Sequence, residues 1–179
     1  MKIFPFSLTK NVLLFIPINS REILYRARDL IVGTNAHIRL CRVATTFIEF
    51  DVAIETKDVD ELVDKLSPIG DLDNIRHVVE EEIEIDQGIK DGIFYFNSER
   101  FWECHEAFEG AWKQSEGEEK ELIQGLILVA AALVHYQKAE DDICLSVLGR
   151  ALEKLHDKSG KYCRINVDDV KQKVVEMLD

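Results

Sequence analysis

The strongest constraint on the fold is the stretch from Phe96 to Tyr136, which contains two successive helical patterns. Its first half, FNSERFWECHEAFEGAW, repeats large apolar side chains every three or four residues, which predicts a helix with one apolar face. Its second half is apolar around nearly its whole circumference from Leu122 to Val134, which is typical of the central helix of a bundle. The stretch therefore predicts a compact helical unit.

Polar side chains interrupt the apolar face of the first helix. His105 falls in the middle of that face, and Glu109, one turn later, falls just inside its edge. Glu103 and Glu106 are expected to point toward water or the helix flank. The pattern predicts a buried or half-buried pair of His105 and Glu109.

Two further polar residues interrupt the second helix. Gln124 and His135 share one stripe of it, about 16 Å apart along the axis. If the two helices pack antiparallel, we expect one of these residues to face His105 and Glu109.

These residues resemble a known family. Phe96 and Phe101, the HExxE segment, the QGLI of Gln124 to Ile127 and the late His135 are similar to the domain of unknown function 309 family over roughly residues 88 to 156. The resemblance implies a compact, all-helical, intracellular domain and brings no established activity. Matched residue by residue, it marks a candidate polar cluster of Glu103, His105, Glu106, Glu109, Trp112, Gln124 and His135. The chain departs from the family after His135, where QKAEDD replaces a Gly-Asn turn.

The chemistry of this cluster leaves three interpretations open. The side chains form a hydrogen-bonded network that ties two helices, they line a small-molecule pocket, or His105 and Glu109 bind a divalent metal with Glu106 or His135. HExxE resembles half of the zinc-binding HExxH motif, but Glu replaces the second His, and the Glu-x-x-His of di-metal bundles is absent. The cofactor is therefore unknown, with a divalent metal as one alternative.

Composition limits the partners and the compartment. A net charge of -12 and a pI near 4.9 argue against nucleic acid or an anionic membrane as a partner. Four cysteines without CxxC spacing are expected to be reduced thiols of a cytoplasmic protein. The apolar run from Val12 to Ile18 is short and contains Pro17, so we expect the N-terminal segment to form a strand and not a signal peptide.

The first part of the chain alternates between strand and helix patterns. We expect a strand near the N-terminus, a helix from Ser20 to Gly33, strands at 37 to 43 and Phe47 to Glu55, a helix from Asp58 and a strand from Ile75 to Ile85. This is the order of the ferredoxin-like βαββαβ fold, so the predicted class is α+β.

Two domains follow from these patterns. Residues 1–87 are the predicted ferredoxin-like domain and residues 88–179 the helical bundle, joined by a polar linker near Asp86 to Gly92. A sheet with one uncovered face favours self-association, so a homodimer is one expectation.

Two functional hypotheses remain. The first is a helical module that binds an unidentified protein or small molecule. The alternative is a metal-dependent hydrolase that uses His105 and Glu109 with Glu106 or His135. The chain shows no nucleophile elbow and no Gly-rich phosphate loop, so the sequence does not decide whether it is an enzyme.

Overall fold

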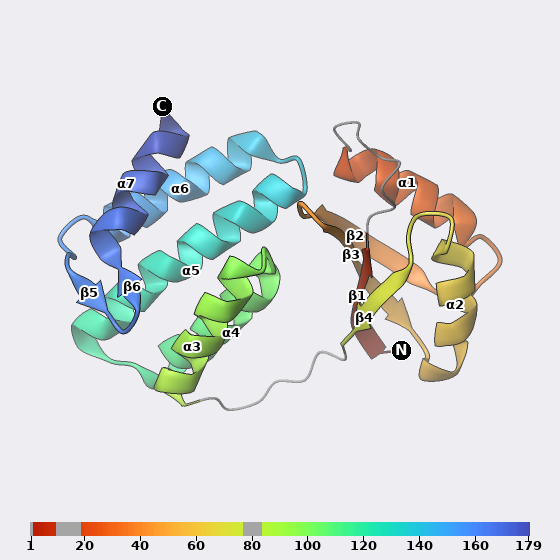
Figure 1. Cartoon of the computed structure of the whole chain (residues 1–179), viewed down its shortest axis with the longest axis horizontal. Helices are drawn as coiled ribbons and strands as arrows, with labels where there is room; N and C mark the ends of the chain where they lie inside the picture. The colour runs from red at the N-terminus through yellow and green to blue at the C-terminus, as the bar shows by residue number, and fades with distance from the viewer. Residues whose placement is uncertain (1, 10–18, 77–83) are drawn as a thin grey trace. The chain divides into compact units, whose positions relative to one another are not determined.

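The protein is an α+β chain, as predicted, with a sheet-containing part followed by a helical part (Figure 1). The computed structural model describes residues 2–9, 19–76 and 84–179, and the side chains of the last two ranges. Two compact units are present. Unit 1 comprises Met1–Glu80 with Gln137–Ala139, and unit 2 comprises Glu81–Tyr136 with Glu140–Asp179.

Unit 1 is built on one antiparallel sheet with the strand order β2-β3-β1-β4. Its elements are β1 (Lys2–Thr9), α1 (Ser20–Leu30), β2 (His37–Val43), β3 (Phe47–Ile54), the short 3-10 helix η1 (Thr56–Asp58), α2 (Val59–Leu66) and β4 (Leu72–Ile75). The strand expected at Ile75 to Ile85 is wrong in its bounds, because β4 ends at Ile75 and Ile85 is the first residue of a helix. Residues 77–83 lie outside the described range. The Val12 to Ile18 run also lies outside it.

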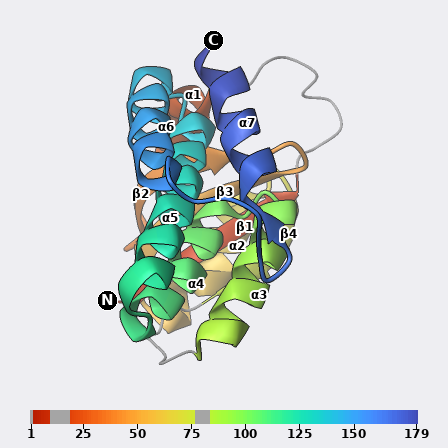
Figure 2. The ribbon, with the colours of Figure 1, turned by 90° about the vertical axis from the view of Figure 1, so that its left-hand side faces the viewer.

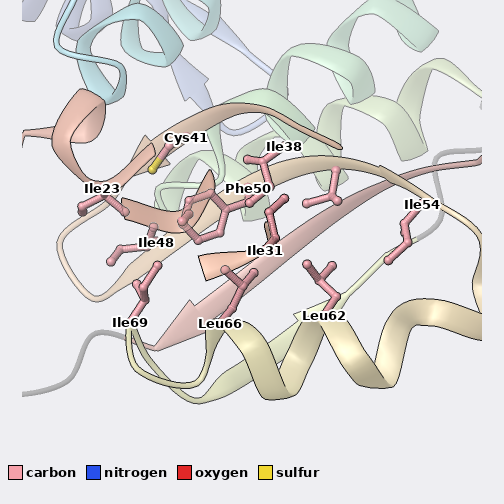
Figure 3. Close-up of a cluster of buried hydrophobic side chains, with 12 residues drawn as sticks. Ile23, Ile31, Ile38, Cys41, Ile48, Phe50, Ile54, Leu62, Leu66 and Ile69 are labelled. Atoms are coloured by element: carbon pink, nitrogen blue, oxygen red, sulfur yellow. The ribbon is translucent and has the colours of Figure 1, made fainter. Parts of the chain in front are cut away.

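The core of unit 1 lies between one face of the sheet and the two helices (Figure 3). Alternate residues of β3 point to this face because side chains of a strand alternate with a period of two. Ile48, Phe50 and Ile54 are at most 1% exposed, and they pack with Leu62 and Leu66 of α2. The clean alternation of β3 in the sequence correctly predicted this face.

The opposite face of β3 carries buried charges. The Arg42 Nη2 atom lies 2.9 Å from Glu49 Oε1, and Arg42 Nε donates to Glu49 Oε2 at 3.1 Å. Both side chains are at most 3% exposed. Pairing of opposite charges offsets part of the cost of burying each of them singly.

Unit 2 is helical. It contains α3 (Ile85–Asn97), α4 (Phe101–Gln114), α5 (Gly117–Gln137), α6 (Asp141–Leu155), the hairpin of β5 (Lys161–Tyr162) and β6 (Ile165–Asn166), and α7 (Val167–Leu178). The hairpin was not predicted, and Figure 2 shows it beside α3. Its Tyr162 and Ile165 pack against the core formed by α3, α4 and α5.

Helix α5 is the central helix of unit 2, as its apolar circumference predicted (Figure 1). Its Ile123, Leu126 and Ala130 belong to the core shared with α3 and α4. Its Val129 and Ala132 belong to a second core shared with α6 and α7. A helix that contributes to two cores has little surface left for water.

The polar linker predicted at Asp86 to Gly92 is wrong, because these residues belong to α3. The two glycines of this segment permit close approach of two helices. A Cβ on Gly88 would lie 2.8 Å from the Ala107 carbonyl oxygen, and a Cβ on Gly92 would lie 2.2 Å from the Phe108 ring. The two glycines therefore let α3 and α4 pack at short range.

Within the described residues, no helix is both long enough and apolar enough to cross a membrane.

Candidate functional site

Helix α4 presents an inward face and a neighbouring half-exposed face. Cys104, Phe108 and Ala111 point inward and are at most 4% exposed. His105 and Glu109 lie about 90° and about 130° around the helix from the centre of that face, at the rate of 100° per residue. Their side chains are 22% and 39% exposed, so this pair is half-buried.

Three side chains converge on this half-exposed face. The His105 Nδ1 atom lies 3.2 Å from Glu106 Oε1 and 3.9 Å from Glu109 Oε2. One ligand atom from each of the three residues lies within 4.8 Å of the other two. We call His105, Glu106 and Glu109 the α4 triad. It forms because two long carboxylate side chains, one adjacent and one a full turn away, reach the same imidazole.

Two more residues of α4 contact the triad. The indole of Trp102 stacks on the His105 imidazole with ring centroids 5.4 Å apart. Lys113 Nζ lies 3.9 Å from Glu109 Oε1. Every side-chain partner of His105 described by the structure is therefore on α4 itself, and the expected hydrogen-bonded tie between two helices is not observed there.

Glu103 does not point to water, so that part of the prediction is wrong. It is 4% exposed, and its Oε1 atom lies 3.4 Å from Arg100 Nη1. The helical pattern placed Glu103 away from the aromatic face but could not show an arginine one turn earlier that pairs with it. Burial of a carboxylate is tolerable when a guanidinium accompanies it.

Trp112 belongs to the contact between α4 and α5. Lys120 Nζ lies 4.3 Å from the centre of its ring, a cation–π contact. The Trp112 Nε1 atom is buried and has no hydrogen-bond partner in the described part of the chain. Trp112 thus acts mainly through packing.

The Trp112–Lys120 contact gives an approximate level for the residues of α5 beside α4, if the two helices run antiparallel. His105 is seven residues before Trp112, so it lies level with about Ile127, seven residues after Lys120. Gln124 is then about 4.5 Å from that level, and His135 about 12 Å. Gln124 is partly buried, and no hydrogen bond or ion pair joins it to the triad in the described part of the chain. The His135 imidazole is bonded to Glu140 and not to the triad.

His135 instead has a partner at the start of the next helix. Its Nδ1 atom lies 2.6 Å from Glu140 Oε2, and its backbone oxygen accepts from the Glu140 N–H at 3.0 Å. The two bonds bridge the end of α5 and the start of α6. Of the seven predicted site residues, the structure thus brings together only His105, Glu106 and Glu109.

The donor set of the triad suits a borderline divalent metal. Imidazole nitrogen and carboxylate oxygen bind zinc at about 2.0–2.2 Å, which puts neighbouring ligand atoms about 3.4 Å apart in a tetrahedral site. The distances of 3.2 and 3.9 Å between His105 and the two glutamates are close to that value, and all three ligand atoms lie within 4.8 Å of one another. The three residues could therefore hold one ion.

The cysteines offer no competing nucleophile at this site. Cys104 is buried next to His105 in sequence, and burial raises the pKa of its thiol well above the ordinary value. Burial likewise raises the pKa of Cys41 to about 12. These thiols stay protonated at neutral pH and are poor nucleophiles.

A surface hollow lies elsewhere in unit 2, at the end of α6. Gly149, Leu152, Lys154 and His156 are among its lining residues. It is wide open to solvent and contains none of the triad, so the convergence of ligand atoms on α4 is the stronger indication of a site.

Comparison with known proteins bears on this same region. Residues 89–147 match the family described as domain of unknown function (DUF309), which confirms the resemblance over most of α3, all of α4 and α5, and the first part of α6. Curated proteins and solved structures give no match. The family description carries no activity, so function has to be argued from the geometry of the triad.

Proposed function

We propose that the helical unit is a binding module that holds one divalent transition-metal ion on His105, Glu106 and Glu109. The observation that supports it is the convergence of one imidazole nitrogen and two carboxylate oxygens within 4.8 Å of one another on one face of α4. Surface glutamates on a helix normally spread apart because like charges repel. A cation would relieve that repulsion here.

The chemical nature of the ligands indicates which ions fit. One imidazole with two carboxylates suits zinc, manganese or ferrous iron better than calcium, which prefers six to eight oxygen ligands. All three side chains are between 22% and 39% exposed. Such an ion would keep coordination positions open toward solvent, where a small molecule or a partner's side chain can bind.

The test is calorimetric titration of chelator-treated protein with zinc and with manganese. We expect about one equivalent to bind, with a loss of at least tenfold in affinity in His105→Ala and in Glu109→Gln, since each removes one of three ligands. His156→Ala serves as the matched control, because His156 is an exposed histidine of the same unit outside the triad. Equal binding by all four proteins would contradict the proposal.

A metal-dependent hydrolase is the second candidate. It is favoured by the open coordination positions, because a metal-bound water of lowered pKa needs such a position. Glu106 is preferred to His135 as the third ligand, because the His135 imidazole is bonded to Glu140. Hydrolysis of activated esters and phosphoesters that requires zinc and disappears in His105→Ala would support it. Metal binding without such hydrolysis would contradict the hydrolase and retain the binding module as the proposed function.

For the rest of the chain we propose that unit 1 is a ferredoxin-like N-terminal domain, followed by the helical domain of unit 2, in a cytoplasmic protein. The antiparallel strand order β2-β3-β1-β4, with α1 and α2 packed on one face, supports the ferredoxin-like assignment. We also propose that the sheet domain regulates the helical module or mediates a homodimer. Light scattering of the full chain tests the dimer, and a strictly monomeric mass would contradict it.

A further inference from the structure

The two oxygens of Glu109 have different partners. Oε2 lies 3.9 Å from His105 Nδ1, and Oε1 lies 3.9 Å from Lys113 Nζ. The carboxylate of Glu109 therefore lies between an imidazole and an ammonium. Lys113 is one turn after Glu109 on the same helix, a spacing that favours ion pairs.

We propose that Lys113 sets the affinity of the α4 triad for cations by competing with them for Glu109. This inference rests on the proposed metal-binding function. The ammonium holds Glu109 while no cation is bound, and an incoming ion must share or displace it. Because ion and ammonium are both positive and would lie on the same carboxylate, the ammonium lowers the affinity of the triad.

The position of Lys113 makes it a competitor and not a permanent block. Its side chain is 55% exposed, and its four-carbon stem lets the ammonium swing into water. Lys120, another lysine close to α4, is already engaged over the ring of Trp112. Any change that removes the charge of Lys113 is therefore expected to strengthen cation binding by the triad.

The test is calorimetric titration of the full chain with manganese chloride at low ionic strength. Lys113→Gln is expected to bind about threefold more tightly than the natural protein, in line with the modest strength of one exposed ion pair. Lys113→Arg keeps the charge and is expected to stay within about 1.5-fold. Raising the salt concentration should shrink the difference, because exposed charges are screened.

The matched control is Lys173→Gln. Lys173 pairs with Glu176 on α7 at 2.6 Å, so this variant makes the same charge change and also frees a glutamate. We expect its affinity for manganese to be unchanged. Equal tightening in Lys113→Gln and Lys173→Gln, or none in Lys113→Gln, would overturn the role of Lys113 and leave the metal site intact. Absence of manganese binding by the natural protein would overturn both proposals.

Discussion

The indole of Trp102 lies nearly parallel to the imidazole of His105, with 7° between the ring planes and 5.4 Å between the ring centroids. The two residues are three positions apart on α4, so the stack forms along one face of the helix. The stack restricts how the imidazole can turn. It thereby helps to keep Nδ1 directed toward Glu106 and Glu109.

Because of this stack, the fluorescence of Trp102 should respond to metal binding at the triad. Binding of cobalt or copper at His105 should quench the fluorescence of Trp102, because the metal would lie within one side chain of the indole. We expect Trp102→Phe to lose most of the quenching and Trp112→Phe to retain it. Quenching that instead follows Trp112 would place the ion elsewhere.

Gly92 in α3 should contribute to stability through its packing against α4. Gly92→Ala puts a Cβ 2.2 Å from the buried Phe108 ring, and we expect it to lower the free energy of unfolding by about 1 to 3 kcal/mol. The control is Gly149→Ala in α6, where nothing lies within 4 Å of the added Cβ. There the higher helix propensity of alanine should raise stability by up to about 1 kcal/mol. Denaturant unfolding checks both, and equal effects would contradict the packing argument.

The same glycines show where sequence reasoning succeeded and failed. Apolar periodicity depends on local geometry alone, so it correctly predicted the alternating β3 and the fully apolar α5. Gly88 and Gly92 were misread as a linker because their role depends on α4, which approaches them from elsewhere in the chain. Two glycines four residues apart in an apolar helical pattern were the sequence signal that could have indicated a close contact between helices.

For the candidate site, too, the local contacts were predicted from the sequence and the contacts that depend on packing were not. The i,i+4 spacing of His105 and Glu109 identified a local pair, and the structure keeps those side chains close. Partners that depend on packing or on a turn, such as Arg100 for Glu103 and Glu140 for His135, were missed. Periodicity gives the direction in which a side chain points but not its level along the neighbouring helix.

Asp51 should make stability depend on pH in unit 1. Burial, the largest influence, raises its pKa above the ordinary value, although Arg42 and Arg39 act in the opposite direction. The folded state therefore binds this proton more tightly than the unfolded state, and the ionised carboxylate destabilises the fold above the folded-state pKa. We expect Asp51→Asn to raise the melting temperature at pH 7.

The pH profile supplies the control for that prediction. The gain in Asp51→Asn should shrink as the pH falls through the folded-state pKa and vanish below the ordinary value of 3.8. Asp64→Asn makes the same charge change at an exposed position and serves as the control for the charge change alone. A gain that is independent of pH would mean that ionisation of Asp51 is not its cause.

Thiol reactivity should single out Cys163. It is the exposed cysteine, while Cys41, Cys104 and Cys144 are buried. With a disulfide-exchange reagent at pH 8, we expect one thiol to react in the folded protein and four in urea. Partial burial and the charges of Asp86 and Glu119 raise the pKa of Cys163, so its reaction should be slower than that of a free thiol. Cys163→Ser should abolish this phase, and a second reactive thiol would contradict the burial of the others.

The most direct test of the metal site is the metal content of untagged protein, measured by elemental mass spectrometry for the natural chain and for His105→Ala, with thermal melts of both. The α4 triad predicts about one equivalent of zinc, manganese or iron in the natural chain and none in the variant. The melts of the metal-free proteins should nearly coincide, because His105 is partly exposed and its partners all lie on α4. No metal in either protein, together with a melt lowered by several degrees in His105→Ala, would contradict the metal site and make the triad a structural contact.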